Sequence, residues 1–468
     1  MTIKSPSLHS LVTFRNSQGE AARGTLLRVE GSAAVFEVYN PYSIVQLSEV
    51  LQHLTIRRGE QTIYGGRAVV NNLVNTGLML IVSAALIDPW LEPLRHLDDD
   101  EAFCTAAGDF VARWEEHHCL APGYRIAVGD LRAFFVALNQ WLEQVRLNEE
   151  KAALNWFSTC GELLRFAAPL YEKLAALHCR FEAEAALLPP AAVGIHKSWF
   201  QRELHPLVMR SPFLHRTYHK PLGYAGDYEM MNMIHRQAPE GPTAYAKIVN
   251  TAYVRLPIAE CVINRVATLE EYLRAAVAAD PRSEIDILSV GCGPALEVQR
   301  FVATVRDAER AHFFMLDFNA ETLAYAQERI AAAAAAAGQR VRVEFLHKSV
   351  HALLKAGSSP FGEEFQARFD FVYCAGLFDY LSDRVCARLI RLFYDWITPG
   401  GVVLVTNMHL ERSHRYVLEH LADWYLIYRN EEQMARLVPG LGRQRIFTDA
   451  TGINVCLEVR KGESASAR

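Results

Sequence analysis

Short apolar segments alternate with helical segments throughout the part of the chain that follows Pro281. Five of the apolar segments have strand length: 285–290, 312–316, 341–346, 369–374 and 402–406. Strands separated by helices are typical of β-α-β units, whose successive strands run parallel in one sheet. Two further segments, 445–447 and 455–459, flank a Thr-Gly turn and predict a terminal hairpin. The sequence therefore predicts an α/β domain, to which we assign residues 258–468.

The first part of the chain has the composition of a small antiparallel barrel. Segments 24–29, 33–39, 61–64 and 67–71 are short and rich in β-branched residues, and turn residues such as Gly65-Gly66 separate them. Short strands bounded by turns are typical of such barrels. We expect a barrel in residues 1–95, with the acidic triplet 98–100 next to its boundary.

Residues 96–257 have mainly helical periodicity. Apolar residues recur at three- and four-residue steps in 131–142 and 163–174, which indicates amphipathic helices. The segment 196–233 is dense in His, Tyr, Pro, Gly and Met and fits no amphipathic pattern. We therefore expect helices in this region and an irregular loop over 215–229.

Composition excludes several classes of protein. The chain of 468 residues is 51% apolar and 22% charged, as in ordinary globular proteins. It has 48 Lys and Arg against 53 Asp and Glu, and the net charge of −5 argues against a partner nucleic acid. No apolar run reaches the roughly 18 residues that a membrane span needs, and the start of the chain lacks the features of a secretory signal. Nine scattered cysteines without a C-x-x-C pair lead us to expect a cytoplasmic protein with no metal. The oligomeric state stays open.

A glycine turn follows the first predicted strand of the α/β domain. The segment ILSVGCGPALE places Gly291, Cys292 and Gly293 between a buried strand and a helix, and such glycines let the main chain approach a ligand closely. Asp317 ends the next strand, 24 positions after Gly293. An acidic residue about 20 positions after such a turn is suited to bind ribose hydroxyls. The motif predicts a nucleoside site.

The third glycine of the dinucleotide motif is absent, because Leu296 occupies its position. This favours a ligand with a single nucleoside. The motif resembles the first motif of class I S-adenosylmethionine-dependent methyltransferases. That resemblance implies a Rossmann-like sheet of seven strands, the last antiparallel, and S-adenosylmethionine as cofactor.

The resemblance also implies roles for individual residues. Gly291, Cys292 and Gly293 would line the methionine part of the cofactor, and Asp317 with Phe318 would contact its ribose. Lys348 and Ser349 follow the third strand and would lie near the adenine, at a position where many relatives carry an acidic residue and this sequence does not. Cys374, Ala375 and Gly376 would lie near the sulfonium of the cofactor. Arg265 would bind the carboxylate of the cofactor, or else it is an ordinary arginine on the surface of a helix.

The loop over 215–229 has two interpretations. It is either a solvent-exposed loop or a lid over the sulfonium, in which Tyr224 and Tyr228 stack and Asp227 or Arg216 anchors a polar group. His409, after the fifth strand, is a candidate base or else a surface or capping group. Aromatic residues in 424–428 are expected in the core, and 378–380 lie where ligands bind in open α/β sheets.

Three segments, HKPLGYAGDYEMMNMI, CAGLFDYLSD and ADWYLIYRNEEQM, resemble a group of bacterial methyltransferases. The group includes proteins associated with making 3-hydroxypalmitic acid methyl ester, which implies a lipid-like carboxylate acceptor. A carboxylate is ionised at neutral pH and needs no base.

The N-terminal barrel resembles a PilZ-like domain. Members that bind cyclic di-GMP carry an R-x-x-x-R pair, whereas Arg23 and Arg28 stand five apart, and the final glycine of the second motif is absent. These departures favour docking of a protein partner over sensing of the dinucleotide.

The sequence thus predicts an enzyme that transfers a methyl group to a small-molecule acceptor. Two alternatives remain open: a cofactor-binding or regulatory protein without chemistry, and an enzyme that displaces another carbon of the sulfonium.

Overall fold

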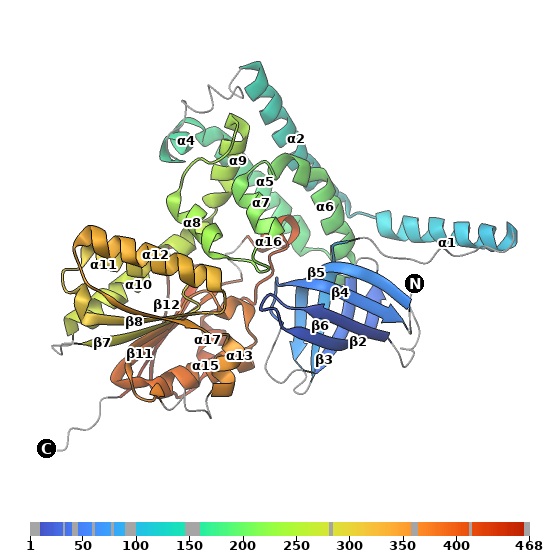
Figure 1. The fold of residues 1–468 in the computed structure, drawn as a ribbon. Helices are drawn as coiled ribbons and strands as arrows, with labels where there is room; N and C mark the ends of the chain where they lie inside the picture. Colours follow the sequence, from blue (N-terminus) through green and yellow to red (C-terminus); the bar gives the residue numbers. More distant parts are fainter. Residues whose placement is uncertain are drawn as a thin grey trace.

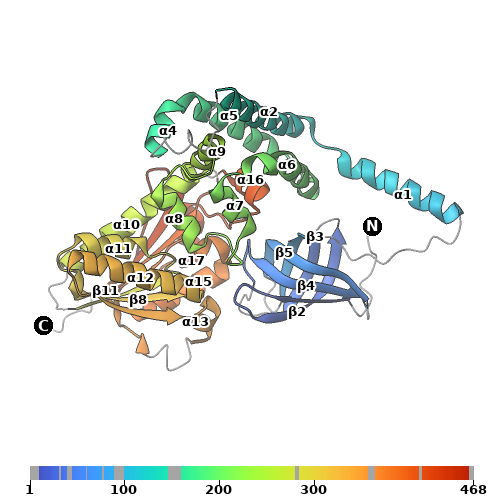
Figure 2. The ribbon, with the colours of Figure 1, turned by 45° about the horizontal axis from the view of Figure 1, so that its top comes forward.

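The structure is a computed structural model, and it describes residues 10–30, 33–39, 45–58, 61–75, 79–88, 100–145, 160–279, 284–356, 364–410 and 414–462. Figure 1 shows a barrel beside an α/β domain, with a layer of helices above both. After a rotation by 45°, the helical layer still covers the two other parts (Figure 2). The predicted fold class is confirmed.

The N-terminal part is a closed barrel of six strands. Its strands are β1 (Ser10–Arg15), β2 (Ala21–Glu30), β3 (Ala33–Tyr39), β4 (Val50–Arg58), β5 (Gln61–Asn75) and β6 (Met79–Leu86), in the spatial order β1-β2-β3-β6-β5-β4. Alternate side chains of these strands, such as Val12, Phe14, Phe36 and Ile56, fill the interior.

One strand of the barrel differs from the expectation. Gly65-Gly66 does not separate two strands but lies inside the continuous strand β5, where these glycines pair with Thr55 and Leu54 of β4. A Cβ atom at Gly66 would lie 2.6 Å from the Asp88 side chain. Gly66 therefore does not form a turn; it lets the Asp88 side chain pack closely against the strand.

Helices form the middle of the chain. They are α1 (Asp100–His118), α2 (Pro122–Gln144), α4 (Cys160–Phe166), α5 (Ala168–Ala186), α6 (Val193–Val208), α7 (Pro212–His219), α8 (Tyr228–Arg236) and α9 (Ala244–Val254), with a short 3₁₀ helix, η1 (Pro190–Ala192). No helix among the described residues has the length and apolar character to cross a membrane.

The segment 196–233 is more helical than expected. It contains most of α6, all of α7 and the start of α8; the turn 209–211 and the segment 220–227 are its non-helical parts. The two short helices begin at side-chain caps, since Ser211 accepts a hydrogen bond from Leu214 N and Asp227 accepts one from Met230 N. Such caps satisfy amide groups that the helix itself leaves free, and they are not visible in apolar periodicity.

The C-terminal part contains a seven-stranded mixed sheet of the order β12-β13-β11-β10-β7-β8-β9. Its strands are β7 (Ile285–Val290), β8 (Ala311–Asp317), β9 (Arg342–His347), β10 (Phe369–Cys374), β11 (Ile397–Met408), β12 (Arg443–Thr448) and β13 (Asn454–Arg460). Only β13 runs antiparallel to its two neighbours. The five parallel strands and the terminal hairpin are as predicted.

Helices cover both faces of this sheet. One face packs against α10 (Pro257–Ala279), α11 (Leu296–Thr304) and α12 (Ala320–Ala337). The other packs against α13 (Val350–Ala356), α15 (Asp383–Trp396) and α17 (Glu431–Leu437). Two short 3₁₀ helices, η2 (Ala308–Arg310) and η3 (Phe378–Tyr380), complete the domain.

Helix α16 (Arg415–Ala422) joins the helical layer although it lies between β11 and α17 in the chain. It packs against α5, α6 and α7, and its buried Val417, Leu418 and Leu421 belong to the core of the helical layer. The first turns of α10 contribute Ile258 and Val262 to the same core. The predicted boundary at residues 257 and 258 therefore falls at the start of a helix that is shared by two parts of the fold.

Candidate active site

A cleft lies at the carboxyl ends of β7, β8 and β10. The turns that follow these strands form its floor, α8 and α10 form one side, and residues 224–226 lie between α7 and α8 at its edge. This is the edge at which open α/β sheets bind ligands.

The glycine turn is built as the sequence predicts. Gly291 and Gly293 have φ values of 70° and 54°, in the left-handed region that glycine adopts without strain. The amides of Gly291 and Cys292 donate hydrogen bonds to the Leu316 carbonyl, at 2.8 and 3.1 Å. A Cβ atom at Gly293 would have no neighbour within 4 Å. The turn therefore leaves space above Gly293 while β8 holds its base.

Asp317 lies next to this turn at the end of β8. Its carboxylate accepts hydrogen bonds from Gly293 N at 3.2 Å and from Asn319 N at 3.0 Å. Burial raises the pKa of Asp317, and these amides oppose the shift. The carboxylate also lines the cleft together with Phe318, so it combines main-chain anchoring with access to a ligand.

Arg265 on α10 reaches the floor of the cleft beside Gly376. A Cβ atom at Gly376, whose φ is 90°, would lie 2.8 Å from Arg265 Nη1. Within the described residues, the guanidinium has neither a hydrogen bond nor an ion pair. A partly buried cation of this kind is suited to an anionic group of a ligand.

Two buried carboxyl groups face the same region. Glu297 accepts a hydrogen bond from Tyr373 OH at 2.8 Å, and burial raises its pKa. Asp379 accepts one from Met408 N at 2.7 Å, and burial raises its pKa to about 6 although Arg265 opposes the shift. Both line the cleft, so its floor carries charges of both signs.

His235 on α8 is a further polar group of the cleft wall. Its Nδ1 atom is buried and has no hydrogen-bond partner among the described residues. Burial, Arg300 and Arg265 lower the pKa of His235 to about 4. The imidazole is therefore neutral at pH 7 and can accept or donate one hydrogen bond toward the cleft.

The segment 220–227, together with Tyr228, lies along the edge of the cleft; we call it the lid. Tyr224 packs edge-on against Phe318, with ring centroids 4.9 Å apart, and its hydroxyl lies 3.3 Å from Thr322 Oγ1. Tyr228 stacks on Tyr325 at 4.6 Å and donates a hydrogen bond to Glu321 at 2.8 Å. Burial raises the pKa of Tyr224, and burial with Glu321 raises that of Tyr228 to about 12. Neither hydroxyl is ionised at neutral pH.

The structure brings eleven of the predicted site residues to the cleft and leaves four outside its lining. Those that line it are Tyr224, Tyr228, Arg265, Gly291, Cys292, Gly293, Asp317, Phe318, Lys348, Ala375 and Gly376. Asp227 lies in the lid, where it caps α8 and pairs with Arg216 Nε at 2.9 Å. Ser349 accepts a hydrogen bond from Ala352 N at the start of α13, and Cys374 is buried.

His409 is the fourth residue outside the lining. Its Nε2 atom lies 3.5 Å from Glu431, and its main-chain amide donates to the Ile453 carbonyl at 2.7 Å. The preceding residue, Met408, is the last residue of β11 and lines the cleft instead.

Several cleft residues were not predicted at a ligand site: Glu297, His235, Trp424 and, from the barrel, Gln18, Gln46 and Leu47. Trp424 Nε1 donates a hydrogen bond to Tyr380 OH at 2.9 Å. Asp379 and Tyr380 also line the cleft, in the segment 378–380 that was expected to lie where ligands bind. No pattern in the sequence connects the barrel residues with this cleft.

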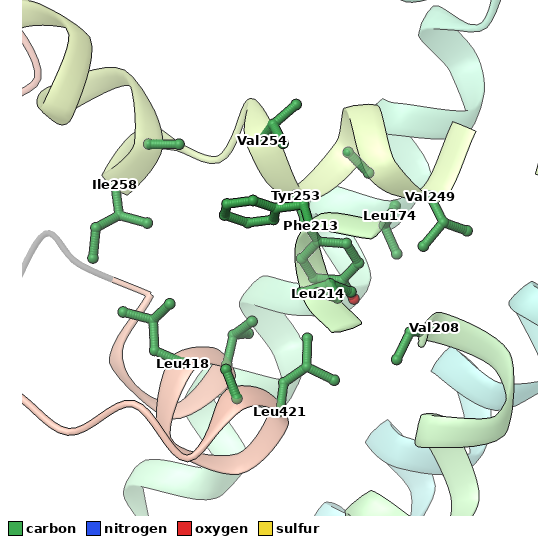
Figure 3. Packing of buried hydrophobic residues seen from close by; sticks show 14 of the residues in the cluster. Leu174, Val208, Phe213, Leu214, Val249, Tyr253, Val254, Ile258, Leu418 and Leu421 are labelled. Atoms are coloured by element: carbon green, nitrogen blue, oxygen red, sulfur yellow. The ribbon is translucent and has the colours of Figure 1, made fainter. Parts of the chain in front are cut away.

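A second, apolar pocket adjoins the cleft. It lies between α7, α9, α10 and α16, and Figure 3 shows Phe213, Tyr253, Ile258, Leu418 and Leu421 around it. Val262, Met408 and Trp424 line both spaces. The hydroxyls of Thr217 and Tyr253 have partners elsewhere, the Phe213 carbonyl and His178 Nε2. The pocket thus presents a hydrophobic surface.

Comparison with known proteins identifies the class of the sheet domain. Residues 287–401 match a family described as a methyltransferase domain. Together with the strand order, this shows that the chain contains a methyltransferase domain of class I type. No curated protein matches the chain.

Solved structures with similar folds include an O-methyltransferase family protein from Burkholderia thailandensis, with 15% identity, a TM-score of 0.38 and coverage of 74% of this chain and 99% of that one. A possible exported protein from Bordetella parapertussis has 19% identity and a TM-score of 0.42, covering 53% and 86% of the two chains. Magnesium protoporphyrin IX methyltransferase from Synechocystis, with bound S-adenosylhomocysteine, has 12% identity and a TM-score of 0.33, covering 44% and 86%. At these values the similarities do not assign a function.

Proposed function

We propose that the protein is an S-adenosylmethionine-dependent methyltransferase that acts on a small-molecule carboxylate. The observation that carries the proposal is that one cleft contains Asp317, beside Gly293, and Arg265, beside Gly376, in a domain that matches methyltransferases. Asp317 is suited to the ribose hydroxyls, and Arg265 is suited to the carboxylate of the methionine part.

The charges on the floor of the cleft support this cofactor. An α-amino acid end carries an ammonium and a carboxylate, and the cleft offers Glu297 and Asp379 as well as Arg265. Phe318 and Tyr224 supply aromatic surface next to Asp317. S-adenosylmethionine, when bound, supplies an electrophilic methyl group on a sulfonium.

The chain's own residues contribute mainly alignment and exclusion of water. An in-line displacement depends on the orientation of the acceptor, to which a rigid site contributes more than acids or bases do. Tyr224 and Tyr228 keep their protons at neutral pH and close the edge of the cleft. Trp424, Tyr380 and Met408 form its apolar wall on the side of β10 and β11. A carboxylate acceptor is consistent with this site, because it reacts without losing a proton.

A fatty acid, in particular a 3-hydroxy fatty acid that yields a methyl ester, is the acceptor that we propose. The apolar pocket supports this choice, because it adjoins the cleft through Val262, Met408 and Trp424 and has no free polar side chain. An acyl chain in this pocket would leave its carboxylate in the cleft.

Purified protein incubated with S-adenosylmethionine and 3-hydroxypalmitate tests the proposal. We expect S-adenosylhomocysteine and the methyl ester to appear in equal amounts by mass spectrometry. Methylthioadenosine as product would indicate displacement at another carbon. Binding of the cofactor by calorimetry without turnover on this acid or on cell extract would indicate a regulatory protein, and turnover on a different compound would overturn the fatty acid.

For the barrel, we propose a PilZ-like module that docks a protein partner. The closed six-stranded architecture supports the resemblance, and Arg23 and Arg28 lie exposed on β2, five positions apart. Titration with cyclic di-GMP tests this proposal, and micromolar affinity would contradict it in favour of dinucleotide sensing.

A further inference from the structure

The barrel contributes directly to the ligand cleft. Gln18, Gln46 and Leu47 line it together with the lid and the methyltransferase residues. Gln18 lies in the turn between β1 and β2, and the other two residues precede β4. Two separate loops of the barrel therefore meet at one wall of the cleft.

A buried carboxylate fixes these two loops relative to each other. Glu49 accepts hydrogen bonds from Ser17 N at 2.7 Å, from Ser17 Oγ at 2.5 Å and from Gln46 N at 2.8 Å. Glu49 is only 2% exposed, so burying its charge is costly unless such donors compensate. The loops that carry Gln18 and Gln46 thus form one rigid surface.

The same surface holds the lid. The amide of Val50 donates a hydrogen bond to the Gly223 carbonyl at 2.8 Å. A Cβ atom at Gly223 would lie 3.4 Å from the Ser17 Cβ atom. Gly223 belongs to the lid and precedes Tyr224, which lies over Phe318. The position of Tyr224 therefore depends on the barrel.

The barrel also contacts the segment that carries Trp424 and Leu426 of the cleft wall. Ser48 Oγ donates to the Tyr425 carbonyl at 2.8 Å and accepts from the Tyr425 amide. Tyr425 lies between Trp424 and Leu426, which both line the cleft. One serine thus ties the barrel to the segment that forms the apolar wall.

We propose that the barrel is the closing wall of the ligand cleft, and that ligands exchange when the barrel separates from the lid and from Tyr425. The described hydrogen bonds across this boundary come from Val50 and Ser48 alone, and Tyr380, Tyr425 and Ile427 pack against the barrel core beside them. A boundary between domains that is held by so few groups permits relative motion. The inference rests on the proposed function in one respect: the experiments use S-adenosylhomocysteine as the ligand.

Ser48→Gly loosens the boundary without straining the chain. Ser48 has a φ of 60°, where glycine is favoured, so the variant loses only the hydroxyl and its two hydrogen bonds. The matched control is His53→Gly, which changes an exposed residue of β4 with a φ of 52°. We expect S-adenosylhomocysteine to leave Ser48→Gly about tenfold faster than wild type in stopped-flow displacement, given two lost hydrogen bonds. His53→Gly is expected to release it at the wild-type rate.

A reversible lock provides the converse experiment. Cysteines at positions 17 and 223 would have Cβ atoms 3.4 Å apart, next to the lower end of the roughly 3.5–4.5 Å range found in disulfides. Because Gly223 has a φ of 84°, the reduced double variant serves as the reference for any strain. We expect oxidation to slow release of S-adenosylhomocysteine at least tenfold and reduction to restore it. The single variants should not respond to oxidation.

The outcomes separate the two proposals. Equal release rates from Ser48→Gly and wild type, with no slowing in the oxidised lock, would overturn the role of the barrel. Failure of wild type to bind S-adenosylhomocysteine would overturn the proposed function instead. Hydrogen exchange of residues 220–227 then decides the role of the barrel without a ligand: faster exchange in Ser48→Gly than in His53→Gly supports it, and equal exchange contradicts it.

Discussion

Main-chain amides, rather than a basic side chain, provide the described hydrogen bonds to Asp317. Gly293 N and Asn319 N donate to its two oxygens, and the raised pKa reflects burial. Amide donors orient a carboxylate without neutralising its charge, so its remaining lone pairs stay strong acceptors. A diol in the cleft would therefore find a fixed, negatively charged partner.

Substituting Asp317 tests this contact. We expect Asp317→Ala to weaken binding of S-adenosylmethionine by about 1–3 kcal/mol, because the ribose hydroxyls lose a charged acceptor. Isothermal calorimetry measures the effect. Asp307→Ala is the control, since Asp307 is exposed and caps no amide of η2. Equal affinities in the two variants would contradict the assignment.

The buried carboxyl of Asp379 gives stability a dependence on pH. Its pKa is raised to about 6 in the folded protein, by burial and against the attraction of Arg265 and Arg429. Since the folded state holds this proton more tightly than the unfolded state, the group lowers stability as pH rises from about 4 to 6. We expect the stability of Asp379→Asn, relative to wild type, to increase over this range. Urea denaturation at a series of pH values measures it, and a pH-independent difference would contradict it.

Among single residues, the sequence predicted those site residues whose positions follow from local chain geometry. Gly291, Gly293 and Asp317 are fixed by a strand, a turn and the next strand, which neighbouring residues specify. His235 and Gln46 reach the cleft only through packing of α8 and of the barrel, and no local pattern records such packing. His409 illustrates the opposite case: the strand was predicted to end at residue 406, but it continues to Met408, which lines the cleft in place of His409.

Among the elements, the loops after β10 and β11 depend on one buried arginine. Arg429 is 2% exposed, and its guanidinium donates to the carbonyls of Phe378 and Leu381 and to Asn407 Oδ1. Its Nη2 also lies 2.7 Å from Asp383 at the start of α15. These contacts join η3, β11 and α15 next to the cleft, so Arg429 positions Asp379 and Tyr380 without lining the site.

Removing the Arg429 guanidinium should lower the stability of the folded protein. We expect Arg429→Met to lower the free energy of unfolding by about 3–5 kcal/mol, because buried carbonyl groups and the amide oxygen lose their donors. Denaturant unfolding measures the change. Arg384→Met, on the exposed side of the same α15 region, should change stability by less than about 0.5 kcal/mol. A similar small effect in both variants would show that solvent replaces the lost donors.

Elements were predicted well where apolar periodicity dominates. The bounds of β7 and β10 are those of the apolar segments, since buried parallel strands are continuous apolar runs. Helices α7 and α8 were missed because they are short and begin at caps, and β5 was divided because glycines in strands resemble turns. In β5, the close approach of Gly66 to Asp88, a contact between residues distant in the chain, overrides the local signal.

For the molecule as a whole, the adjoining pockets define what an acceptor can be. The cleft is formed by all three parts of the chain, whereas the apolar pocket lies within the core shared by the helical layer and α10. A ligand that occupies both must be polar at one end and apolar at the other. Sequence analysis could predict each part of the fold separately but not this meeting of the parts.

A larger side chain in the apolar pocket should impair methylation of long acceptors more than methylation of short ones. We expect Ala259→Leu to reduce kcat/KM for 3-hydroxypalmitate about tenfold, because the added carbons occupy space needed by the acyl chain. Turnover of a short acid such as 3-hydroxybutyrate, and affinity for S-adenosylhomocysteine, should stay within twofold of wild type. Methyl-ester formation across a series of chain lengths measures this, and a uniform loss for all lengths would contradict the pocket's role.

The position of α16 in the chain affects how the protein folds while it is being synthesised. The helical layer needs Leu418 and Leu421 to complete its core, yet these residues emerge long after α6, which ends at Val208. At about 5–20 residues per second, the nascent helices wait roughly 10–40 seconds for their missing partner. During that interval their apolar faces stay open to the cell's chaperones, and the layer completes only once most of the methyltransferase domain has been synthesised.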